Sequence, residues 1–201
     1  MEDSPLSSMV IKSLIRDYKV FFSRSVFESL HSELKPDDVI FIDKNVFSHL
    51  PIGVQNIITT NKHVFIDANE GQKSYTALTP IIENLIKNRF RKNNRLIAIG
   101  GGITQDMTAF IASMMYRGVE WLFFPTTLLA QADSCIGGKS SINIGKYKNQ
   151  LGNFYPPIKI FIVPEFVKSL PKLDFKSGMG EMLHFYLVSS EEDFLFYNDH
   201  Y

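Results

Sequence analysis

RLIAIGGGITQD, residues 95–106, is the most informative stretch of the sequence for its fold. An apolar run typical of a buried strand leads into Gly100–Gly102 and then into a helical pattern that begins near Thr104. Glycine lets the backbone approach a ligand closely, and a helix N-terminus offers free N–H groups and the positive end of a dipole. The stretch therefore predicts a pyrophosphate-binding turn, against the alternative of a tight turn that binds nothing. The three consecutive glycines do not have the GxGxxG spacing, so the stretch is not an ordinary Rossmann dinucleotide-binding motif.

Strand and helix patterns alternate on both sides of this turn. Continuous apolar runs, as expected of strands buried on both faces, occur at residues 18–22, 39–43, 64–67, 96–99, 121–124 and 160–163. Helical patterns occur at about 25–34, 75–90, 104–115 and 126–134. The alternation predicts an α/β fold: a Rossmann-like, mostly parallel sheet with flanking helices, followed by the beginning of a helical domain. We expect the polar segment 141–153 to be a loop.

The C-terminal part of the sequence suggests a second domain. The segment 171–180, PKLDFKSGMG, precedes a fresh helical run that starts at Glu181. We therefore predict one domain over residues 1–175 and the start of another over residues 176–201. Helical spacing continues up to Tyr201 without a stop signal, so we expect an incomplete domain. The alternative is a natural C-terminal helix that docks on the body of the protein.

The composition restricts the class of protein. The 21 basic residues balance the 21 acidic ones, so we expect neither a nucleic-acid partner nor a membrane partner. No apolar run approaches the length of a bilayer span, and the N-terminus lacks a signal pattern. Cys135 is the single cysteine and cannot form an internal disulfide. We predict a cytoplasmic protein in which Cys135 is a small packing residue.

Three acidic residues follow apolar strands or begin a helix. Asp106 falls within the first turn of the helix after the glycines, where it either complements the dipole or accepts hydrogen bonds from a cofactor. Asp43 and Asp67 each close an apolar strand, at the edge where ligand crevices open in α/β sheets. Each could hold a ribose, and each could equally be a helix N-cap.

A second motif, PTTLLAQADSCIGGK over residues 125–139, is followed by Lys146, Lys148 and Asn149. Lysines beside a Gly-Gly pair predict an anion site, against the alternative of a solvated basic loop. Asp133 stands in an otherwise uncharged helical pattern. Its carboxylate is expected either to pair with Lys139 or to be placed for proton chemistry.

The segments GGGITQDMTAFIASMMYRG, FPTTLLAQADSCIGGKSSIN and KNQLGNFYPP closely resemble the 3-dehydroquinate synthases. The resemblance covers about residues 40–200 and is strongest over residues 100–156. It implies an N-terminal α/β NAD domain and a C-terminal helical domain, with substrate, zinc and NAD meeting between them. It also implies a carbon–oxygen lyase of the shikimate pathway of aromatic amino acid biosynthesis. That enzyme cyclises a seven-carbon sugar-acid phosphate with loss of phosphate, and NAD is oxidant and then, as NADH, reductant.

The resemblance assigns a cofactor role to ten residues. Gly100, Gly101 and Gly102 would lie on the NAD pyrophosphate, and Asp106, Thr126 and Thr127 would contact the cofactor. Asp43, Glu70 and Lys73 would hold its adenosine end, and Lys148 would lie near the cofactor.

The resemblance also assigns the substrate and metal residues. Lys139 and Asn149 would bind the substrate phosphate, and Asp133 would belong to the catalytic polar network around the hydroxyl that is oxidised. Arg117 would reach the substrate of a neighbouring subunit, which implies a homodimer. Glu181 would be one of three ligands of a divalent metal, zinc in this family. We therefore expect the 201-residue chain alone to be inactive.

The sequence departs from the family pattern at three places. His184 stands where the family has a lysine beside the substrate, which leaves the exact substrate open; alternatively, Glu181 and His184 both face a metal. Val163 and Pro164 replace a threonine and an aspartate, and YKN replaces GKN. One rival function is another sugar-phosphate cyclase or a glycerol-dehydrogenase-like oxidoreductase, although a phosphate-binding pair counts against the dehydrogenase. The other rival is a non-catalytic NAD-binding or dimerisation module.

Overall fold

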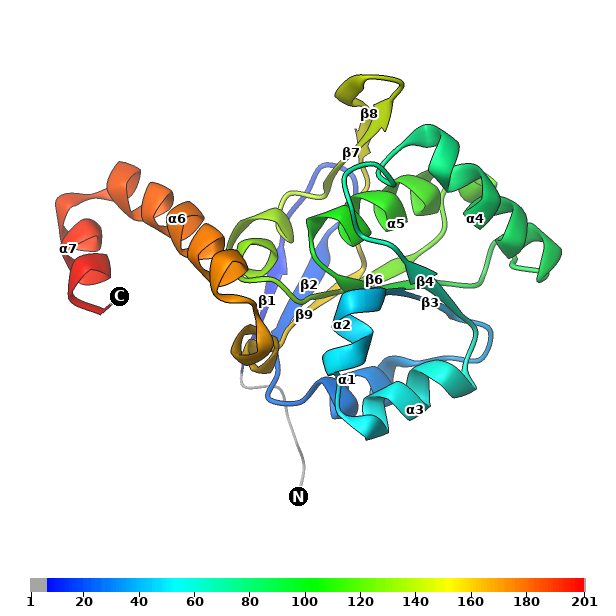
Figure 1. Ribbon diagram of the computed structural model, residues 1–201, viewed down its shortest axis with the longest axis horizontal. Coiled ribbons are helices and arrows are strands. Elements are labelled where there is room, and N and C mark those ends of the chain that lie inside the picture. The colour runs from blue at the N-terminus through cyan, green and yellow to red at the C-terminus, as the bar shows by residue number, and fades with distance from the viewer. Residues whose placement is uncertain (1–6, 201) are drawn as a thin grey trace.

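A seven-stranded sheet forms the centre of the computed structural model, which describes residues 7–200 (Figure 1). The strand order is β1-β2-β9-β6-β5-β3-β4, and every neighbouring pair is parallel except β1 and β2. The predicted α/β fold with a mostly parallel sheet is confirmed. The strands are β1 (Ser7–Ile11), β2 (Tyr18–Phe22), β3 (Val39–Asp43), β4 (His63–Ile66), β5 (Leu96–Gly100), β6 (Trp121–Pro125) and β9 (Lys159–Ile162).

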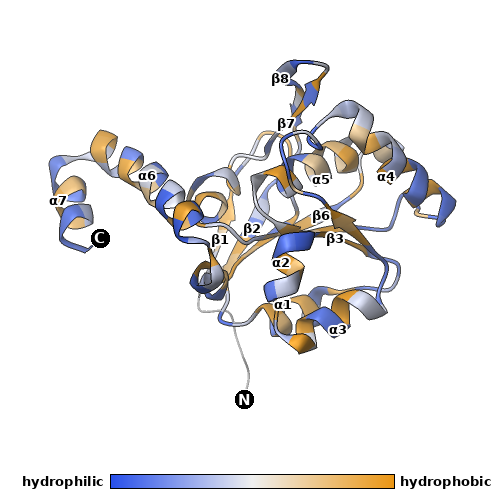
Figure 2. Ribbon diagram, in the orientation of Figure 1, coloured by the Kyte–Doolittle hydropathy of each residue, from blue (hydrophilic) through white to orange (hydrophobic). Residues whose placement is uncertain are grey.

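Helices cover both faces of the sheet (Figure 1). Successive strand residues point to opposite faces, so Ile97 and Ala98 of β5 belong to two different core clusters. One cluster includes residues of α1 and α3, and the other includes residues of α4 and α5. Figure 2 shows the strands between them as predominantly hydrophobic. The helices are α1 (Val26–Glu33), α2 (Lys44–His49), α3 (Ile52–Thr60), α4 (Tyr75–Lys87) and α5 (Gly102–Met114), with a 3₁₀ turn η1 at Met115–Arg117.

The helix after the glycines begins earlier than predicted. It starts at Gly102 rather than near Thr104, because Gly101 is the extended N-cap residue, with φ −86° and ψ −165°. Asp106 therefore lies in the second turn of α5, not in the first. Helices α2 and α3 and strand β1 were not predicted. Strand β1 is short and mostly exposed, α2 buries none of its residues, and α3 is short and buries only Val54 and Ile58.

The predicted loop over residues 141–153 is wrong. This segment lies in an antiparallel hairpin of β7 (Lys139–Ile144) and β8 (Tyr147–Phe154), which stands apart from the main sheet (Figure 1). Its side chains are mostly polar because β8 is largely exposed, whereas β7 turns Ser140 and Ile142 inward against α5. The helical pattern before the hairpin forms a short helix that ends in a π-helix, η2 (Ala130–Ser134).

The fresh helical run predicted from Glu181 is also wrong. Helix α6 (Lys172–Ser189) is continuous through the glycine-containing segment. A Cβ at Gly178 would lie 2.6 Å from the Cβ of Leu128, so glycine allows α6 to pack closely on the segment before η2. The predicted boundary between residues 175 and 176 falls inside α6, and the division into two domains stays a prediction.

Helices α6 and α7 (Glu191–His200) extend from the body of the molecule and follow the 3₁₀ helix η3 (Pro164–Ser169) (Figure 1). Tyr197 of α7 donates a hydrogen bond to the carbonyl oxygen of Met179 at 2.9 Å, which folds α7 back on α6. Leu195 of α7 is half exposed. Within residues 7–200, no helix combines the length and apolar character needed to cross a membrane.

Candidate functional site

A cavity of about 530 Å³ lies at the carboxyl ends of β3, β5 and β6, and we call it the carboxyl-edge cavity. Parallel strands end at one edge of the sheet, and ligand crevices of α/β proteins open there. Strand β3 ends at Asp43, and the turns after β5 and β6 follow Gly100 and Pro125. The lining includes five of the ten predicted cofactor residues: Asp43, Gly101, Gly102, Thr126 and Thr127.

The three glycines of the turn are needed for different reasons. A Cβ at Gly100 would lie 2.4 Å from the Oγ1 of Thr104, and one at Gly101 would lie 3.0 Å from the Cγ2 of Thr127. These two positions are restricted by the packing of the protein itself. A Cβ at Gly102 would meet only the Oγ of Ser134, at 3.9 Å. Glycine at position 102 therefore leaves open space at the N-terminus of α5, where no side chain caps the free N–H groups.

The hydroxyl of Thr126 points to a missing hydrogen-bond partner. Thr126 is 2% exposed, and its Oγ1 has no hydrogen-bond partner among the described residues. Leaving a buried polar group unpaired costs about 1–3 kcal/mol, so native structures seldom do so. Since Thr126 lines the carboxyl-edge cavity, a ligand in that cavity could accept or donate the missing hydrogen bond. The buried Oγ1 of Thr104 likewise has no partner among residues 7–200.

Asp43 has a structural contact as well as a position in the cavity. Its Oδ1 accepts a hydrogen bond from the N–H of Asn45 at 2.8 Å, so it is the N-cap of α2. Burial raises the pKa of Asp43, and the backbone N–H groups of Asn45 and Val46 oppose that shift. The carboxylate can therefore cap α2 and still face a ligand. Asp67 does not line this cavity, and its Oδ1 accepts a hydrogen bond from Asn69 Nδ2 at 3.0 Å.

A smaller cavity of about 170 Å³ lies beside the carboxyl-edge cavity and shares Gly102 with it. Lys139, Ser141 and Asp106 are among its lining residues. Lys139 is exposed there, and within residues 7–200 the structure records no ion pair between Lys139 and Asp133. The pairing considered for these two residues is therefore not formed, which leaves the ammonium of Lys139 available for an anion.

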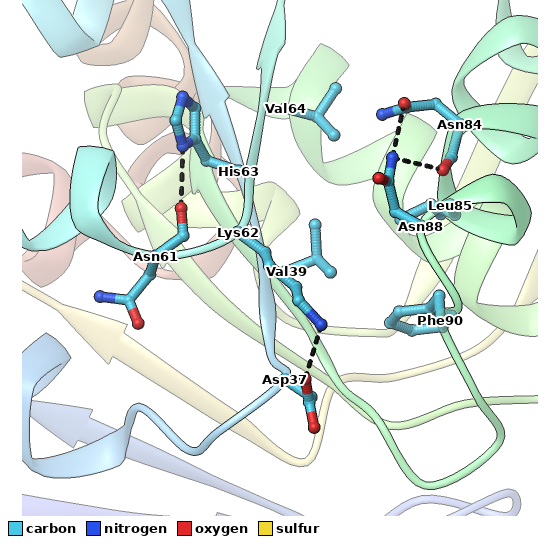
Figure 3. A pocket seen from close by; sticks show the side chains of 10 residues that line it. All are labelled: Asp37, Val39, Asn61, Lys62, His63, Val64, Asn84, Leu85, Asn88 and Phe90. Atoms are coloured by element: carbon cyan, nitrogen blue, oxygen red, sulfur yellow. Dashed lines mark hydrogen bonds and ion pairs between the residues drawn. The ribbon is translucent and has the colours of Figure 1, made fainter.

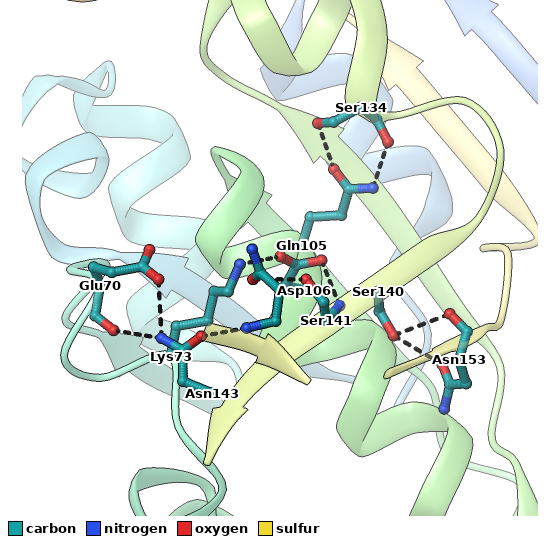
Figure 4. Close-up of polar contacts among 10 residues, drawn as sticks. Glu70, Lys73, Gln105, Asp106, Ser134, Ser140, Ser141, Asn143 and Asn153 are labelled. Atoms are coloured by element: carbon teal, nitrogen blue, oxygen red, sulfur yellow. Dashed lines mark hydrogen bonds and ion pairs between the residues drawn. The ribbon is translucent and has the colours of Figure 1, made fainter. Parts of the chain in front are cut away.

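Asp106 forms a buried polar contact that the sequence did not reveal (Figure 4). Its Oδ2 accepts a hydrogen bond from Lys73 Nζ at 2.8 Å, and its Oδ1 accepts one from the N–H of Ser141 at 3.0 Å. Burial raises the pKa of Asp106, and the ammonium of Lys73 opposes that shift. Both residues were predicted to contact the cofactor. In the structure they contact each other, and their role toward the cofactor stays a prediction.

Asn143 connects the other predicted residues of this region (Figure 4). Its Nδ2 donates to Oε1 of Glu70 at 2.9 Å, and its Oδ1 accepts from the N–H of Asn149 at 2.8 Å. Sequence reasoning missed Asn143, although a polar residue between two isoleucines of a strand was a signal. Lys148 is exposed on β8 beside Asn149.

Arg117 lies near the start of β6, at the opposite edge of the sheet from the carboxyl-edge cavity. It lines a separate cavity of about 530 Å³ together with Arg16, Lys92 and Tyr155. Another cavity, of about 310 Å³, lies at the start of β3 and β4 and is lined by His63, Asn84 and Asn88 among others (Figure 3). None of the predicted site residues lines the cavity in Figure 3.

The predicted metal residues lie on α6. Glu181 is partly buried and His184 is exposed, and His184 packs against Phe185 with ring centroids 6.0 Å apart. In the described part of the chain, no three His, Cys, Asp or Glu side chains lie close enough together to hold a metal ion. Glu181, alone or with His184, thus supplies fewer than the three protein ligands typical of a catalytic zinc site.

This chain is similar in sequence to the 3-dehydroquinate synthases. The model of the 3-dehydroquinate synthase N-terminal domain matches residues 63–177. The 3-dehydroquinate synthase of Pelagibacter ubique is 33% identical over 207 residues, which cover 96% of this chain and 55% of that protein. This chain therefore spans about half the length of the curated relative.

Two solved structures share the fold of this chain. The 2-epi-5-epi-valiolone synthase of Streptomyces hygroscopicus, solved with NAD⁺ and Zn²⁺ bound, is 25% identical with a TM-score of 0.79. The match covers 90% of this chain and 53% of that one. Glycerol dehydrogenase from Schizosaccharomyces pombe is 21% identical with a TM-score of 0.61, over 84% of this chain and 42% of that one, and shows a shared fold alone.

Proposed function

This chain belongs to the 3-dehydroquinate synthase family, and from that premise we propose that it is the NAD-binding part of a 3-dehydroquinate synthase. The complete enzyme would be a carbon–oxygen lyase of the shikimate pathway that cyclises a sugar-acid phosphate with loss of phosphate. The observation that carries the proposal is the carboxyl-edge cavity, where Gly102 leaves open space at the N-terminus of α5.

The residues of the carboxyl-edge cavity fit a dinucleotide. The free N–H groups at the start of α5 suit the two negative charges of a pyrophosphate. The unpartnered hydroxyl of Thr126 would gain its hydrogen bond from the cofactor, and the carboxylate of Asp43 suits ribose hydroxyls. A bound NAD would supply the hydride acceptor and, once reduced, the hydride donor. The residues of this chain bind NAD and fix its orientation.

The smaller cavity supports a phosphorylated substrate beside the cofactor. Lys139 lines it and has no carboxylate partner among the described residues, so it can form charge-assisted hydrogen bonds with phosphate. Asn149 lies close by, since its Oδ1 accepts a hydrogen bond from the Oγ of Ser141 at 3.0 Å. Because both cavities share Gly102, a phosphate near Lys139 would place the rest of the substrate toward the cofactor. We propose Lys139 and Asn149 as phosphate ligands, with Asp133 and His184 nearer the sugar.

A divalent metal and a second subunit complete the proposal. Glu181 would contribute one metal ligand, and the described residues do not complete the site. Zn²⁺ in the related valiolone synthase supports zinc. Arg117 faces away from the carboxyl-edge cavity of its own chain, which supports a role at a neighbouring subunit's substrate and hence a homodimer. A cytoplasmic location stays a prediction from the single cysteine.

Calorimetric titration with NAD tests the cofactor assignment. We expect the wild-type chain to bind NAD and Gly102→Val to bind at least tenfold more weakly, because the added side chain fills the space at the start of α5. Gly180→Ala is the matched control, since a Cβ at Gly180 meets nothing within 4 Å and Gly180 lies outside both cavities. Equal NAD affinity in wild type and Gly102→Val would refute the pyrophosphate position.

A further inference from the structure

Asn143 is a buried residue of β7 whose side chain is fully hydrogen bonded (Figure 4). Its Nδ2 donates to two oxygens of Glu70, Oε1 at 2.9 Å and the carbonyl at 3.2 Å. Its Oδ1 accepts from the N–H of Asn149 at 2.8 Å. Its backbone N–H donates to the carbonyl oxygen of Lys73 at 2.8 Å. One amide therefore joins the loop before α4 to the β7–β8 hairpin.

The residues that Asn143 contacts on the loop before α4 and on β8 are proposed to bind different ligands. Glu70 and Lys73 are proposed to hold the adenosine end of NAD, and Asn149 is proposed to bind the substrate phosphate. Asn143 itself lines neither the carboxyl-edge cavity nor the smaller cavity. Its contacts are thus with residues proposed to bind ligands, and not with the ligands.

The backbone at Asn149 depends on this contact. Asn149 has φ +54°, in the left-handed region, which asparagine adopts more readily than most other non-glycine residues. The β7–β8 register is also interrupted between Ile142 and Ile144, so no regular ladder partner holds the chain there. The Oδ1 of Asn143 supplies the acceptor that this irregular segment lacks.

We propose that Asn143 is a positioning residue that couples NAD binding to phosphate binding. Contacts of NAD with Glu70 and Lys73 would hold the amide of Asn143 more firmly, and the amide in turn holds Asn149 toward the phosphate. By linkage, phosphate then strengthens NAD binding by the same factor. This inference rests on the proposed function, because it assumes that both ligands bind where we have placed them.

The hairpin has other anchors, so Asn143 can be altered without releasing it. The N–H of Ser141 donates to Asp106, which is also paired with Lys73. Asn153 of β8 donates to the Oγ of Ser113 on α5 and accepts from the Oγ of Ser140. Asn153 is therefore the matched control: it anchors the same hairpin, but it contacts none of the residues proposed to bind ligands.

The test measures the affinity for inorganic phosphate by calorimetry, without NAD and with saturating NAD. In the wild-type chain we expect NAD to strengthen phosphate binding about fivefold or more, the lower end of typical allosteric couplings. Asn143→Asp keeps an acceptor for Asn149 but sets a carboxylate against Glu70, so we expect the ratio to fall by about twofold or more. The contacts Lys73–Asp106, Asp106–Ser141 and Ser141–Asn149 remain, so part of the coupling should persist. Asn153→Asp should keep the wild-type ratio.

A rescue variant separates positioning from a general loss of structure. Combining Asn143→Asp with Glu70→Gln reverses donor and acceptor between the two side chains, but the new carboxylate still faces the carbonyl oxygen of Glu70, so we expect it to restore part of the coupling. Because Glu70 is itself proposed to hold NAD, the ratio is measured at an NAD concentration that saturates this variant. If Asn143→Asp does not fold, Asn143→Ala, which adds no charge, should show the same loss. A wild-type chain that binds both ligands with no coupling, or an Asn143 variant with unchanged coupling, would overturn the inference. A wild-type chain that binds no NAD would instead contradict the proposed function.

Discussion

Replacing Lys73 by methionine should destabilise the folded chain by about 3 kcal/mol at neutral pH. The Lys73 and Asp106 side chains are only 9% and 18% exposed, and their ion pair spans 2.8 Å. Removing one partner of a buried pair costs about 3–5 kcal/mol, since the remaining charge is left in a poorly solvated place. Asp106 keeps its hydrogen bond from the N–H of Ser141 and some solvent contact, so we expect the lower end of that range.

The loss should also depend on pH in a defined direction. Burial raises the pKa of Asp106 above its unfolded value, so the folded chain takes up a proton at a higher pH than the unfolded chain does. The free energy of unfolding therefore falls as pH rises through that window. Without the opposing charge of Lys73, the pKa of Asp106 in the folded chain rises further. The pH range over which the folded chain loses stability then extends to higher pH. The loss in Lys73→Met should thus be larger at about pH 7 than at about pH 4.

Urea unfolding, followed by the fluorescence of the buried Trp121, measures this loss. Lys62→Met is the matched control, because Lys62 pairs with Asp37 on the surface, where the two side chains are 49% and 58% exposed. Such exposed pairs contribute less than about 1 kcal/mol. A loss below about 1 kcal/mol in Lys73→Met at neutral pH, or equal losses at the two pH values, would refute the reasoning.

Three further results are expected. Burial raises the pKa of the Cys135 thiol to about 12, so a thiol reagent at about pH 8 should modify it only as fast as the chain unfolds; labelling at the rate of a free thiol would contradict this. Lys139→Ala should weaken phosphate binding about ten- to a hundredfold while NAD affinity and thermal stability stay unchanged, whereas Lys146→Ala in the exposed turn should change none of the three. Because burial raises the pKa of Asp43, NAD affinity should fall as pH drops through that raised value, and Asp43→Asn should remove this pH dependence.

The sheet and the position of its cavity could be predicted because they depend on local patterns. Continuous apolar runs identified six of the strands, and the ends of β3, β4, β5 and β6 were marked by a change to Asp, Gly or Pro. Since parallel strands end at one edge, the grouping of Asp43, Gly101 and Thr126 followed from those positions.

The contacts between distant segments could not be predicted in this way. Lys73 and Asp106 are 33 residues apart, and nothing in either local sequence shows that they pair. The hairpin was missed because its outer strand is exposed and carries no apolar alternation. Helix α6 was divided wrongly because Gly178, which reads as a helix stop, is required by the close approach of Leu128.

The position of β9 has a consequence for the order in which the sheet assembles. Among the described strands, β9 alone joins β2 to the rest of the sheet, and its residue Lys159 pairs with Lys19, 140 positions earlier in the chain. During synthesis, β1 and β2 therefore emerge first and can pair with each other, but β2 finds its parallel neighbour last. Strands β3 to β6 pair over shorter separations and can associate sooner. We expect the sheet to grow from the β4 edge toward the β1 edge, with Tyr18 and Val20 exposed until residues 159–162 have been made.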